Sequence, residues 1–330
     1  MSAGVKLDQD SREDRSWLTV MVFVTAVELA CWTFAWGARI APTPFVLTYV
    51  ALAFAALGSA LLLRWVLHRR PPRPNWLTVI PATICVGVGA SVFLPLKYAI
   101  PHILPFWLDA SLVGAERSVF GTDPWMLLDH LFGWAAVPMD KLYGLWLPTQ
   151  ALVMFTVMLQ PPSAAKTRAL IAYVLTWFVL GVVAATAFSS AGPIFHDRVF
   201  GGDSFAALVA TLRSRGASMV LAESDRMWTS FASARPGIVA GISAVPSIHV
   251  AISIWFVFAA RVLAPSAAKY AALYSLVIWV GSVQLGWHYA TDGLAGALGA
   301  WAIWGLSRPL AAILRDGWSA GARRHATQLS

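Results

Sequence analysis

The stretch Gly286-Trp-His-Tyr-Ala-Thr-Asp-Gly-Leu-Ala-Gly296 opens the last apolar segment of the sequence and places a histidine and an aspartate at its start. His288 and Asp292 are four residues apart, slightly more than one helical turn, so both side chains share one face of a helix. A carboxylate inside a hydrophobic segment is costly unless a partner stabilises it. We therefore expect His288 to be the partner of Asp292.

The composition indicates an integral membrane protein. Of the 330 residues, 58% are hydrophobic and only 12% are charged, whereas about a quarter of the residues in soluble domains are charged. Apolar segments recur along the whole chain, so we expect one all-α integral membrane protein. The formal net charge of +8 then reflects membrane topology, and it does not indicate a nucleic-acid partner.

Eight segments approach the roughly 20 residues that a helix needs to cross a bilayer. They are Trp17–Trp36, Phe45–Leu67, Trp76–Leu96, Asp140–Leu159, Arg168–Phe188, Ser247–Leu263, Ala267–Gly286 and Tyr289–Leu306. We expect a cytoplasmic tail over residues 1–16, two accessory helices within 17–75, a membrane domain over 76–306, and a basic cytoplasmic tail over 307–330.

The distribution of Lys and Arg predicts the orientation. They are enriched in the short loops on the side of the two termini, which favours cytoplasmic termini in a bacterial-type plasma membrane. The long loops Lys97–Met139 and Ser189–Pro246 then face the extracytoplasmic side. Both contain amphipathic patterns, over Trp107–Phe120 and Ser204–Arg215, so both loops are expected to be structured, and the first helix is expected to lie on the membrane surface.

A second histidine is predicted to lie at the same depth as the first. Pro246 is well tolerated beside the first turn of a helix, so His249 should lie in that turn. The sixth and eighth predicted helices both start on the extracytoplasmic side, which places His249 and His288 at one membrane face.

Two histidines and an aspartate at one depth have three interpretations. They are separate structural residues, or a metal site formed by His249, His288 and Asp292, or a phosphoryl-transfer site. In the third case His288 attacks phosphorus, Asp292 orients it, and His249 protonates the leaving oxygen. The helix N-terminus at Ser247 would then bind phosphate oxygens.

The residues that carry this constellation resemble a known family. Val245-Pro-Ser-Ile-His249 is similar to the Pro-Ser-x-His motif of the type 2 phosphatidic acid phosphatase (PAP2) superfamily. Trp287-His-Tyr-Ala-Thr-Asp292 is similar to its closing His-x-x-x-Asp motif. The resemblance covers roughly residues 76–306 and implies a six-helix core, with His288 as nucleophile, Asp292 as its partner and His249 as general acid.

One branch of the superfamily, the inositol phosphorylceramide synthases or inositolphosphotransferases, resembles the chain more closely. Its Gly-x-x-Ala-x-Pro-Ser-x-His pattern is matched by Gly241–His249, and its His-Tyr-x-x-Asp pattern by His288–Asp292. Asp109…Glu116…Phe120-Gly-Thr-Asp-Pro124 and Tyr143-Gly-Leu-Trp146 are also similar to that branch. The resemblance implies transfer of a phosphoinositol-type head group between lipids, as in sphingolipid metabolism.

The chain departs from the phosphatase pattern at its cationic positions. That pattern has Lys, six residues and Arg-Pro, for which no string exists here, and a Ser-Arg before the closing motif, where this chain has Gly281-Ser282. At least one cation is still expected at the phosphate. The candidates are Lys141, Arg198, Arg226 and Arg235, each of which is alternatively a solvated loop charge.

Two further features have open interpretations. Glu28 lies in the middle of the first predicted span, as a functional carboxylate or as a packing contact with another helix. The stretch Ser189-Ser-Ala-Gly-Pro193 either lines the pocket or ends the fifth helix.

The predicted protein is a phosphotransferase acting on a phospholipid or lipid phosphate at the extracytoplasmic face. A lipid-phosphate phosphatase is the alternative, and a transporter or channel is the alternative from another class. The predicted chemistry needs no metal and no nucleotide cofactor. The sequence leaves open the donor, the acceptor and the oligomeric state.

Overall fold

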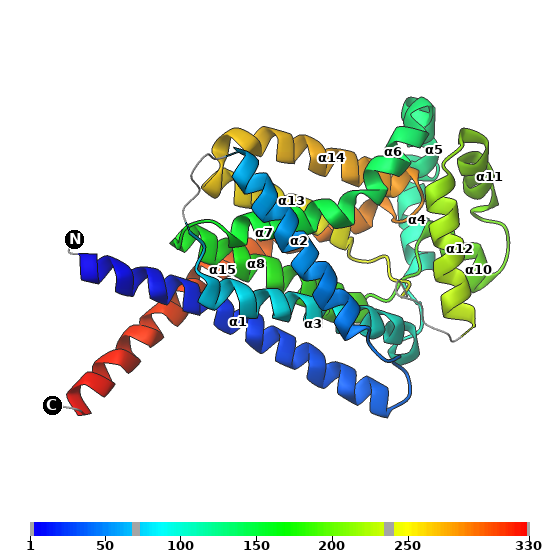
Figure 1. Ribbon diagram of the computed structural model, residues 1–330. Coiled ribbons are helices and arrows are strands. Elements are labelled where there is room, and N and C mark those ends of the chain that lie inside the picture. The colour runs from blue at the N-terminus through cyan, green and yellow to red at the C-terminus, as the bar shows by residue number, and fades with distance from the viewer. Residues whose placement is uncertain (1–2, 68–72, 234–240, 329–330) are drawn as a thin grey trace.

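The computed structural model describes residues 3–67, 73–233 and 241–328, and within these ranges it contains helices and no strand (Figure 1). In chain order the elements are α1 (Ala3–Gly37), α2 (Val46–Leu67), α3 (Trp76–Ile103), α4 (Asp109–Phe120), α5 (Pro124–Phe132), η1 (Gly133–Ala135), α6 (Ala136–Gly144), α7 (Trp146–Met158), α8 (Ala164–Leu175), η2 (Thr176–Ala184), α9 (Ala185–Ala187), α10 (Pro193–Phe200), α11 (Ala206–Arg215), α12 (Ser218–Ala232), α13 (Ile248–Leu263), η3 (Pro265–Ala267), α14 (Ala268–Gln284) and α15 (Ala290–Gln328).

Six helices are long and apolar enough to cross a membrane, which supports the predicted integral membrane protein. Among the described residues they are Glu13–Gly37, Val46–Leu67, Trp76–Ile103, Ala164–Ala187, Pro265–Gln284 and Ala290–Gly317. The two other predicted spans coincide with shorter apolar helices, Trp146–Met158 and Ile248–Leu263. The first of these is short because the chain turns at Leu145, between α6 and α7. A total of eight crossings therefore stays a prediction.

The bundle is built around α13. This helix packs against α8, α14 and α15, and its Trp255 is 1% exposed. The Trp255 indole N–H donates a hydrogen bond of 2.7 Å to the carbonyl of Ala169 in α8. On one flank, α1 and α2 pack against α3, and they also contact α8 and α7, respectively. The two N-terminal helices thus cover one side of the helices that form the site.

A buried ion pair lies at the end of the bundle away from the histidines. Lys166 Nζ, at the start of α8, is 2.9 Å from Asp14 Oδ1, and the two side chains are 2% and 0% exposed. Asp14 also accepts hydrogen bonds from Trp17, Asn75 and Thr78. A buried carboxylate requires such partners. The polar N-terminal stretch was expected to be a tail, but it is helical from Ala3. At the other end of the chain, α15 continues without a break into the predicted C-terminal tail.

The two long loops fold into helices that gather at the other end of the bundle. In Figure 1, α4, α5, α6, α10, α11 and α12 lie together at the right, beyond the ends of α13 and α14. We call these six helices the cap. The predicted helix at Trp107–Phe120 forms as α4 and ends at Gly121, whose φ is 72°. The predicted pattern at Ser204–Arg215 forms as α11.

Glu28 faces a neighbouring helix. Its side chain is 6% exposed, and a Cβ added to Gly89 of α3 would lie 3.0 Å from its carboxylate. Glycine at position 89 thus leaves room for the carboxylate between α1 and α3. This placement agrees with the packing interpretation of Glu28.

Candidate active site

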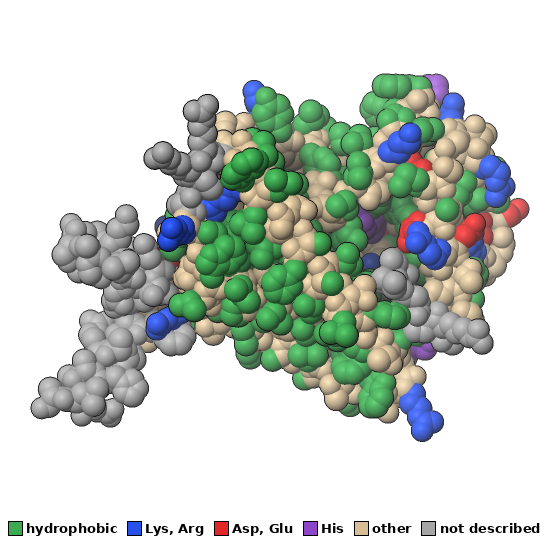
Figure 2. Space-filling view, viewed as in Figure 1, with side chains coloured by type: hydrophobic (Ala, Val, Ile, Leu, Met, Phe, Trp, Pro, Cys, Tyr) green, Lys and Arg blue, Asp and Glu red, His purple; other side chains and the backbone are tan. Residues whose placement is uncertain are grey.

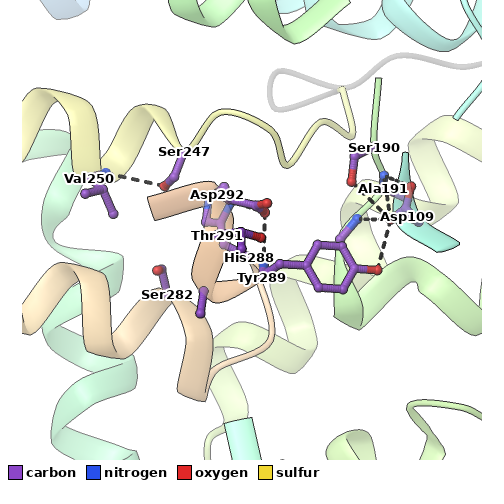
Figure 3. Close-up of polar contacts among 12 residues, drawn as sticks. Asp109, Ser190, Ala191, Ser247, Val250, Ser282, His288, Tyr289, Thr291 and Asp292 are labelled. Carbon is purple, nitrogen blue, oxygen red and sulfur yellow. Dashed lines mark hydrogen bonds and ion pairs between the residues drawn. The ribbon is translucent and has the colours of Figure 1, made fainter. Parts of the chain in front are cut away.

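The three residues predicted to carry the chemistry lie together. His288 lies in the turn between α14 and α15, Asp292 in the first turn of α15, and His249 in the first turn of α13. His288 Nδ1 is 3.4 Å from Asp292 Oδ2, and the ring centroids of His249 and His288 are 5.8 Å apart. Figure 3 shows His288 and Asp292 side by side, with Ser247 on the neighbouring helix start.

Asp292 is held by local backbone groups as well as by His288. Its side chain has no exposed surface, and its Oδ2 accepts a hydrogen bond of 2.9 Å from the backbone N–H of Tyr289. The first turn of a helix is also where unpaired N–H groups and the helix dipole favour negative charge. Both effects stabilise the buried carboxylate. The hydrogen bond from Tyr289 also fixes Oδ2, which is the oxygen that faces His288.

Backbone hydrogen bonds join the three segments that carry the site. Ser247 N–H donates to the carbonyl of Asp292 at 3.0 Å, and Ala244 N–H donates to that of Ser190 at 2.9 Å. Ile194 N–H donates to the carbonyl of Gly286 at 2.9 Å. Residues 189–194, 244–247 and 286–292 therefore form one unit, although they are far apart in the sequence. The stretch Ser189–Pro193 belongs to this unit.

Gly296 permits the close approach of the two helices that bear the histidine motifs. A Cβ at this position would lie 2.4 Å from the carbonyl oxygen of Ser247, far inside any normal contact. The side chain of Ser247 caps α13, because its hydroxyl accepts a hydrogen bond of 3.4 Å from Val250 N–H. Its predicted role in binding phosphate stays a prediction.

Asp109, at the start of α4, supports the site from the cap. Its carboxylate has no exposed surface and accepts hydrogen bonds from Ala191 N–H at 3.0 Å and Gly192 N–H at 2.9 Å. The hydroxyls of Ser190 and Tyr289 donate to it as well, each at 3.1 Å (Figure 3). One carboxylate thus binds the 189–194 segment to the residue next to His288.

Glu116 holds the same turn, two helical turns further along α4. Its Oε1 accepts hydrogen bonds from the backbone N–H of Thr291 at 2.8 Å and from the Thr291 hydroxyl at 2.9 Å. Burial raises the pKa of Glu116, and the hydrogen bonds from Thr291 act in the opposite direction. Asp109 and Glu116 therefore hold opposite ends of the short segment between His288 and Asp292.

His249 is enclosed by aromatic rings. Its ring centroid is 4.2 Å from that of Trp146 and 4.8 Å from that of Tyr143, which stacks on it at an interplanar angle of 23°. Its buried Nδ1 has no hydrogen-bond partner among the described residues. The ring orientation is therefore fixed by packing, and a substrate oxygen would supply the missing polar partner.

Among the described residues, Lys97 is the cation whose charge acts on the two histidines, and its role was not predicted from the sequence. It lies in the last turns of α3, and its charge acts on both His249 and His288. The backbone of α3 at Lys97 packs against Gly241. A Cβ added to Gly241 would lie 2.9 Å from the carbonyl carbon of Lys97. A weak sequence signal existed, because Lys97 is followed by six residues and then by Leu104-Pro105, the phosphatase spacing with leucine replacing arginine.

The four cations selected from the sequence have other surroundings. Arg198 pairs with Asp225, Arg226 pairs with Glu223, and Lys141 is exposed on α6. Arg235 lies outside the described residues. Their predicted role in binding phosphate stays untested, and Lys97 now joins them as a candidate.

The described residues offer no metal site of the kind considered from the sequence. Within those residues no three His, Cys, Asp or Glu side chains are grouped so that they could hold a metal ion. The interpretation of His249, His288 and Asp292 as metal ligands therefore gains no support. Figure 2 shows a histidine in a recess between the apolar bundle and the cap, with Lys or Arg and Asp or Glu side chains at its border.

Replacing Glu116 tests whether α4 positions the catalytic turn. Glu116→Ala leaves the partly buried N–H of Thr291 without its acceptor, at a cost of about 1–3 kcal/mol. We expect kcat to fall by about 10-fold to 100-fold, since 1.4 kcal/mol in a barrier corresponds to a factor of about ten. Glu116→Gln keeps an acceptor oxygen and should retain most of the activity.

The matched control is Glu223→Ala, which removes a carboxylate from the cap surface, where it pairs with Arg226. This variant should keep the kcat of the unmodified protein. Unchanged kcat in Glu116→Ala, with the protein folded, would contradict the positioning role.

Comparison with known proteins agrees with this geometry. The sequence pattern of the PAP2 superfamily matches residues 110–306, which include His249, His288 and Asp292. No curated protein and no solved structure matches the chain. The match covers more than half of the chain and contains both histidine motifs, and the chain therefore belongs to the PAP2 superfamily.

Proposed function

We propose that this protein is a membrane phosphotransferase that moves a phospho-head group from one lipid to an alcohol acceptor through a covalent intermediate on His288. Membership of the PAP2 superfamily suggests phosphatase or phosphotransferase activity on lipid phosphates. The observation that carries the proposal is the geometry of the triad. His288 Nδ1 faces Asp292 at 3.4 Å, and the ring of His249 lies 5.8 Å from that of His288.

In the first step, His288 acts as the nucleophile. Its Nδ1 faces Asp292 Oδ2 at 3.4 Å, and we therefore assign the attack on phosphorus to the other ring nitrogen, Nε2. The bond between phosphorus and the lipid oxygen breaks, and protonated His249 gives its proton to that oxygen. Asp292 offsets the positive charge that develops on the imidazole of His288.

In the second step, an acceptor hydroxyl attacks phosphorus. His249, now neutral, takes the proton of that hydroxyl, and the bond between Nε2 and phosphorus breaks. The proton balance closes, because His249 regains the proton that it gave in the first step. Water as the acceptor gives a phosphatase, and an alcohol gives a transferase. Both reactions use the same residues.

The charge of the site favours a phosphodiester donor. A phosphate monoester carries up to two negative charges at neutral pH, and a diester carries one. Among the described residues, Lys97 is the one cation whose charge acts on both histidines, while leucine stands at position 104, where the phosphatase pattern has arginine. Fewer cations match a lower substrate charge, since electrostatic stabilisation works by matching the charge that develops. Transfer of an intact head group requires such a diester.

The sequence pattern at Gly241–His249 also supports the transferase branch. Gly241 has a φ of 116°, and an added Cβ would lie 2.9 Å from the backbone of Lys97. Glycine at this position thus keeps Lys97 close to the histidine segment. A phosphoinositol-type head group, an extracytoplasmic active site and cytoplasmic termini in a bacterial-type plasma membrane complete the proposal.

Product analysis distinguishes the two acceptors. The purified protein in lipid nanodiscs is incubated with phosphatidylinositol or phosphatidic acid, with and without an alcohol acceptor such as ceramide. We expect phosphatidylinositol to yield diacylglycerol and a new phosphodiester only when the acceptor is present. Release of inorganic phosphate from phosphatidic acid, with no new diester under any condition, would replace the transferase with a phosphatase.

The control for this experiment is a pair of histidine variants. His288→Ala removes the nucleophile and should abolish every product, whereas His130→Ala, at an exposed position of the cap, should leave turnover unchanged. Turnover that persists in His288→Ala would remove the phosphohistidine mechanism from both reactions.

Lys97 is expected to be the cation that contributes most to turnover. Lys97→Met should lower kcat/KM by about 100-fold to 1,000-fold, the range seen when one preorganised electrostatic group is removed. Lys97→Arg keeps the charge and should restore part of the loss. The measurement is initial rate against substrate concentration in nanodiscs.

Lys141→Met is the matched control, because it removes an exposed lysine from α6 without a change near the histidines. Its kcat/KM should equal that of the unmodified protein. A large loss in Lys141→Met together with full activity in Lys97→Met would reverse the assignment.

A further inference from the structure

The corner formed by α5, η1 and α6 exposes eight large apolar side chains. Trp134 in η1 is 82% exposed, and Leu131 at the end of α5 is 59% exposed. The other exposed apolar residues from Pro124 to Leu145 are Met126, Leu127, Phe132, Val137, Leu142 and Leu145. We call residues 124–145 the α5–α6 hairpin. Contiguous apolar patches of this kind mark interaction sites.

Both aspartates of the hairpin contact the rest of the cap, whereas His130 and Lys141 are exposed. Asp129 pairs with Arg215 of α11 at 2.9 Å, and Asp140 accepts hydrogen bonds from the backbone N–H groups of Met219 and Val220 at the start of α12. The hairpin therefore has two faces. One is tied to α11 and α12 through Asp129 and Asp140, and the other exposes mainly apolar side chains that no described residue covers.

The uncovered face continues the membrane surface of the bundle. α5 and α6 both pack against α14, a helix long and apolar enough to span a membrane. α14 exposes Leu273 and Leu276 at 61% and 57%, as a lipid-facing helix does. Figure 1 shows α5 and α6 beside the end of α14 at the upper right, and Figure 2 shows hydrophobic side chains at the same corner.

The depth of the hairpin is set by the active site. Tyr143, near the end of α6, stacks on His249 at 4.8 Å, so this end of the hairpin lies at the level of the catalytic histidines. The chain then continues into the bundle as α7. Residues before Tyr143 consequently lie at the boundary between the bundle and the cap, where tryptophan side chains are favoured in membrane proteins.

We propose that the α5–α6 hairpin is an in-plane membrane element, with its apolar face in the leaflet on the catalytic side. The partner is therefore a lipid surface. Three observations favour lipid over a second copy of the chain. The apolar face continues the exposed surface of α14, Asp129 and Asp140 both contact the cap, and Trp134 is exposed between α5 and α6. The inference needs only the membrane-spanning helices, and it is independent of the reaction catalysed.

The proposal changes the role of α4. The sequence predicts α4 as the helix that lies on the membrane surface, but its Asp109 and Glu116 are buried against the catalytic turn. In this arrangement α4 is a support inside the cap, and the adjacent hairpin contacts the bilayer. A lipid whose phosphorus reaches His288 would thus enter the site beside the α5–α6 hairpin, which itself lies among the lipid head groups.

Site-directed spin labelling tests the proposal. The two native cysteines, Cys31 and Cys85, are replaced by serine, and one cysteine is introduced as Leu131→Cys or Trp134→Cys. Each protein is labelled with a nitroxide in liposomes, and its collision rates with oxygen and with a water-soluble nickel chelate are measured. Oxygen concentrates in the bilayer, and the chelate stays in water.

Two control positions give the accessibility expected in lipid and in water. Leu276→Cys reports the lipid-facing surface of α14, and Ser214→Cys reports an exposed position of α11 on the cap. We expect both hairpin labels to match Leu276→Cys, with high oxygen and low chelate accessibility.

Chelate accessibility like that of Ser214→Cys would place the hairpin in water and overturn the proposal. Low accessibility to both reagents, with short distances between labels on two molecules, would instead show that a second copy covers the face, and this too would overturn it. Labelled proteins that have lost turnover remain informative, since the collision rates do not depend on catalysis.

Discussion

The desolvated carboxylate of Asp292 is the constraint on which the site depends. A carboxylate without exposed surface requires stabilising partners, and here they are Tyr289 N–H, His288 and the first turn of α15. The carbonyl of the same residue accepts the N–H of Ser247, which begins the helix of His249. Asp292 therefore positions one histidine through its side chain and the segment of the other through its backbone.

The cap supports this arrangement from outside the bundle. Asp109 binds the backbone of the 189–194 segment and the Tyr289 hydroxyl, and Glu116 binds Thr291. Both carboxylates come from one face of α4, seven residues apart. The short turn between His288 and Asp292 is thus held by α4 on the cap side and by the first turn of α15. These contacts provide polar partners that the bilayer itself does not offer.

The sequence was sufficient for the parts of the site that follow from local periodicity and from counting helices. The pairing of His288 with Asp292 follows from their spacing, and the common depth of His249 and His288 follows from the two intervening helices. The contacts of Asp109 and Glu116 could not be derived this way, because they join residues 180 and 175 positions apart. The separation of α6 from α7 was also not predicted, although Gly144 and Pro148 flank the turn at Leu145 and are helix-breaking signals.

Lys97 shows a different limit of sequence reasoning. A search for the complete phosphatase motif passes over it, because Leu104 occupies the position of the arginine. The charge of Lys97 acts on both imidazoles, whereas Arg198 and Arg226 pair with acidic residues of the cap. The same substitution that hid the motif lowers the positive charge at the site, which supports a diester donor in the proposed reaction.

The proposed reaction requires a covalent intermediate on His288, and trapping that intermediate tests the mechanism most directly. The protein is mixed with a lipid donor labelled with ³²P, quenched with alkali within the first turnover, digested and analysed by mass spectrometry. The phosphohistidine mechanism predicts a phosphoryl adduct on the peptide that contains His288. The adduct should be stable in alkali and lost in acid, and it should be absent from the His288→Ala protein. An adduct on any other residue, or turnover without any adduct on His288, would contradict it.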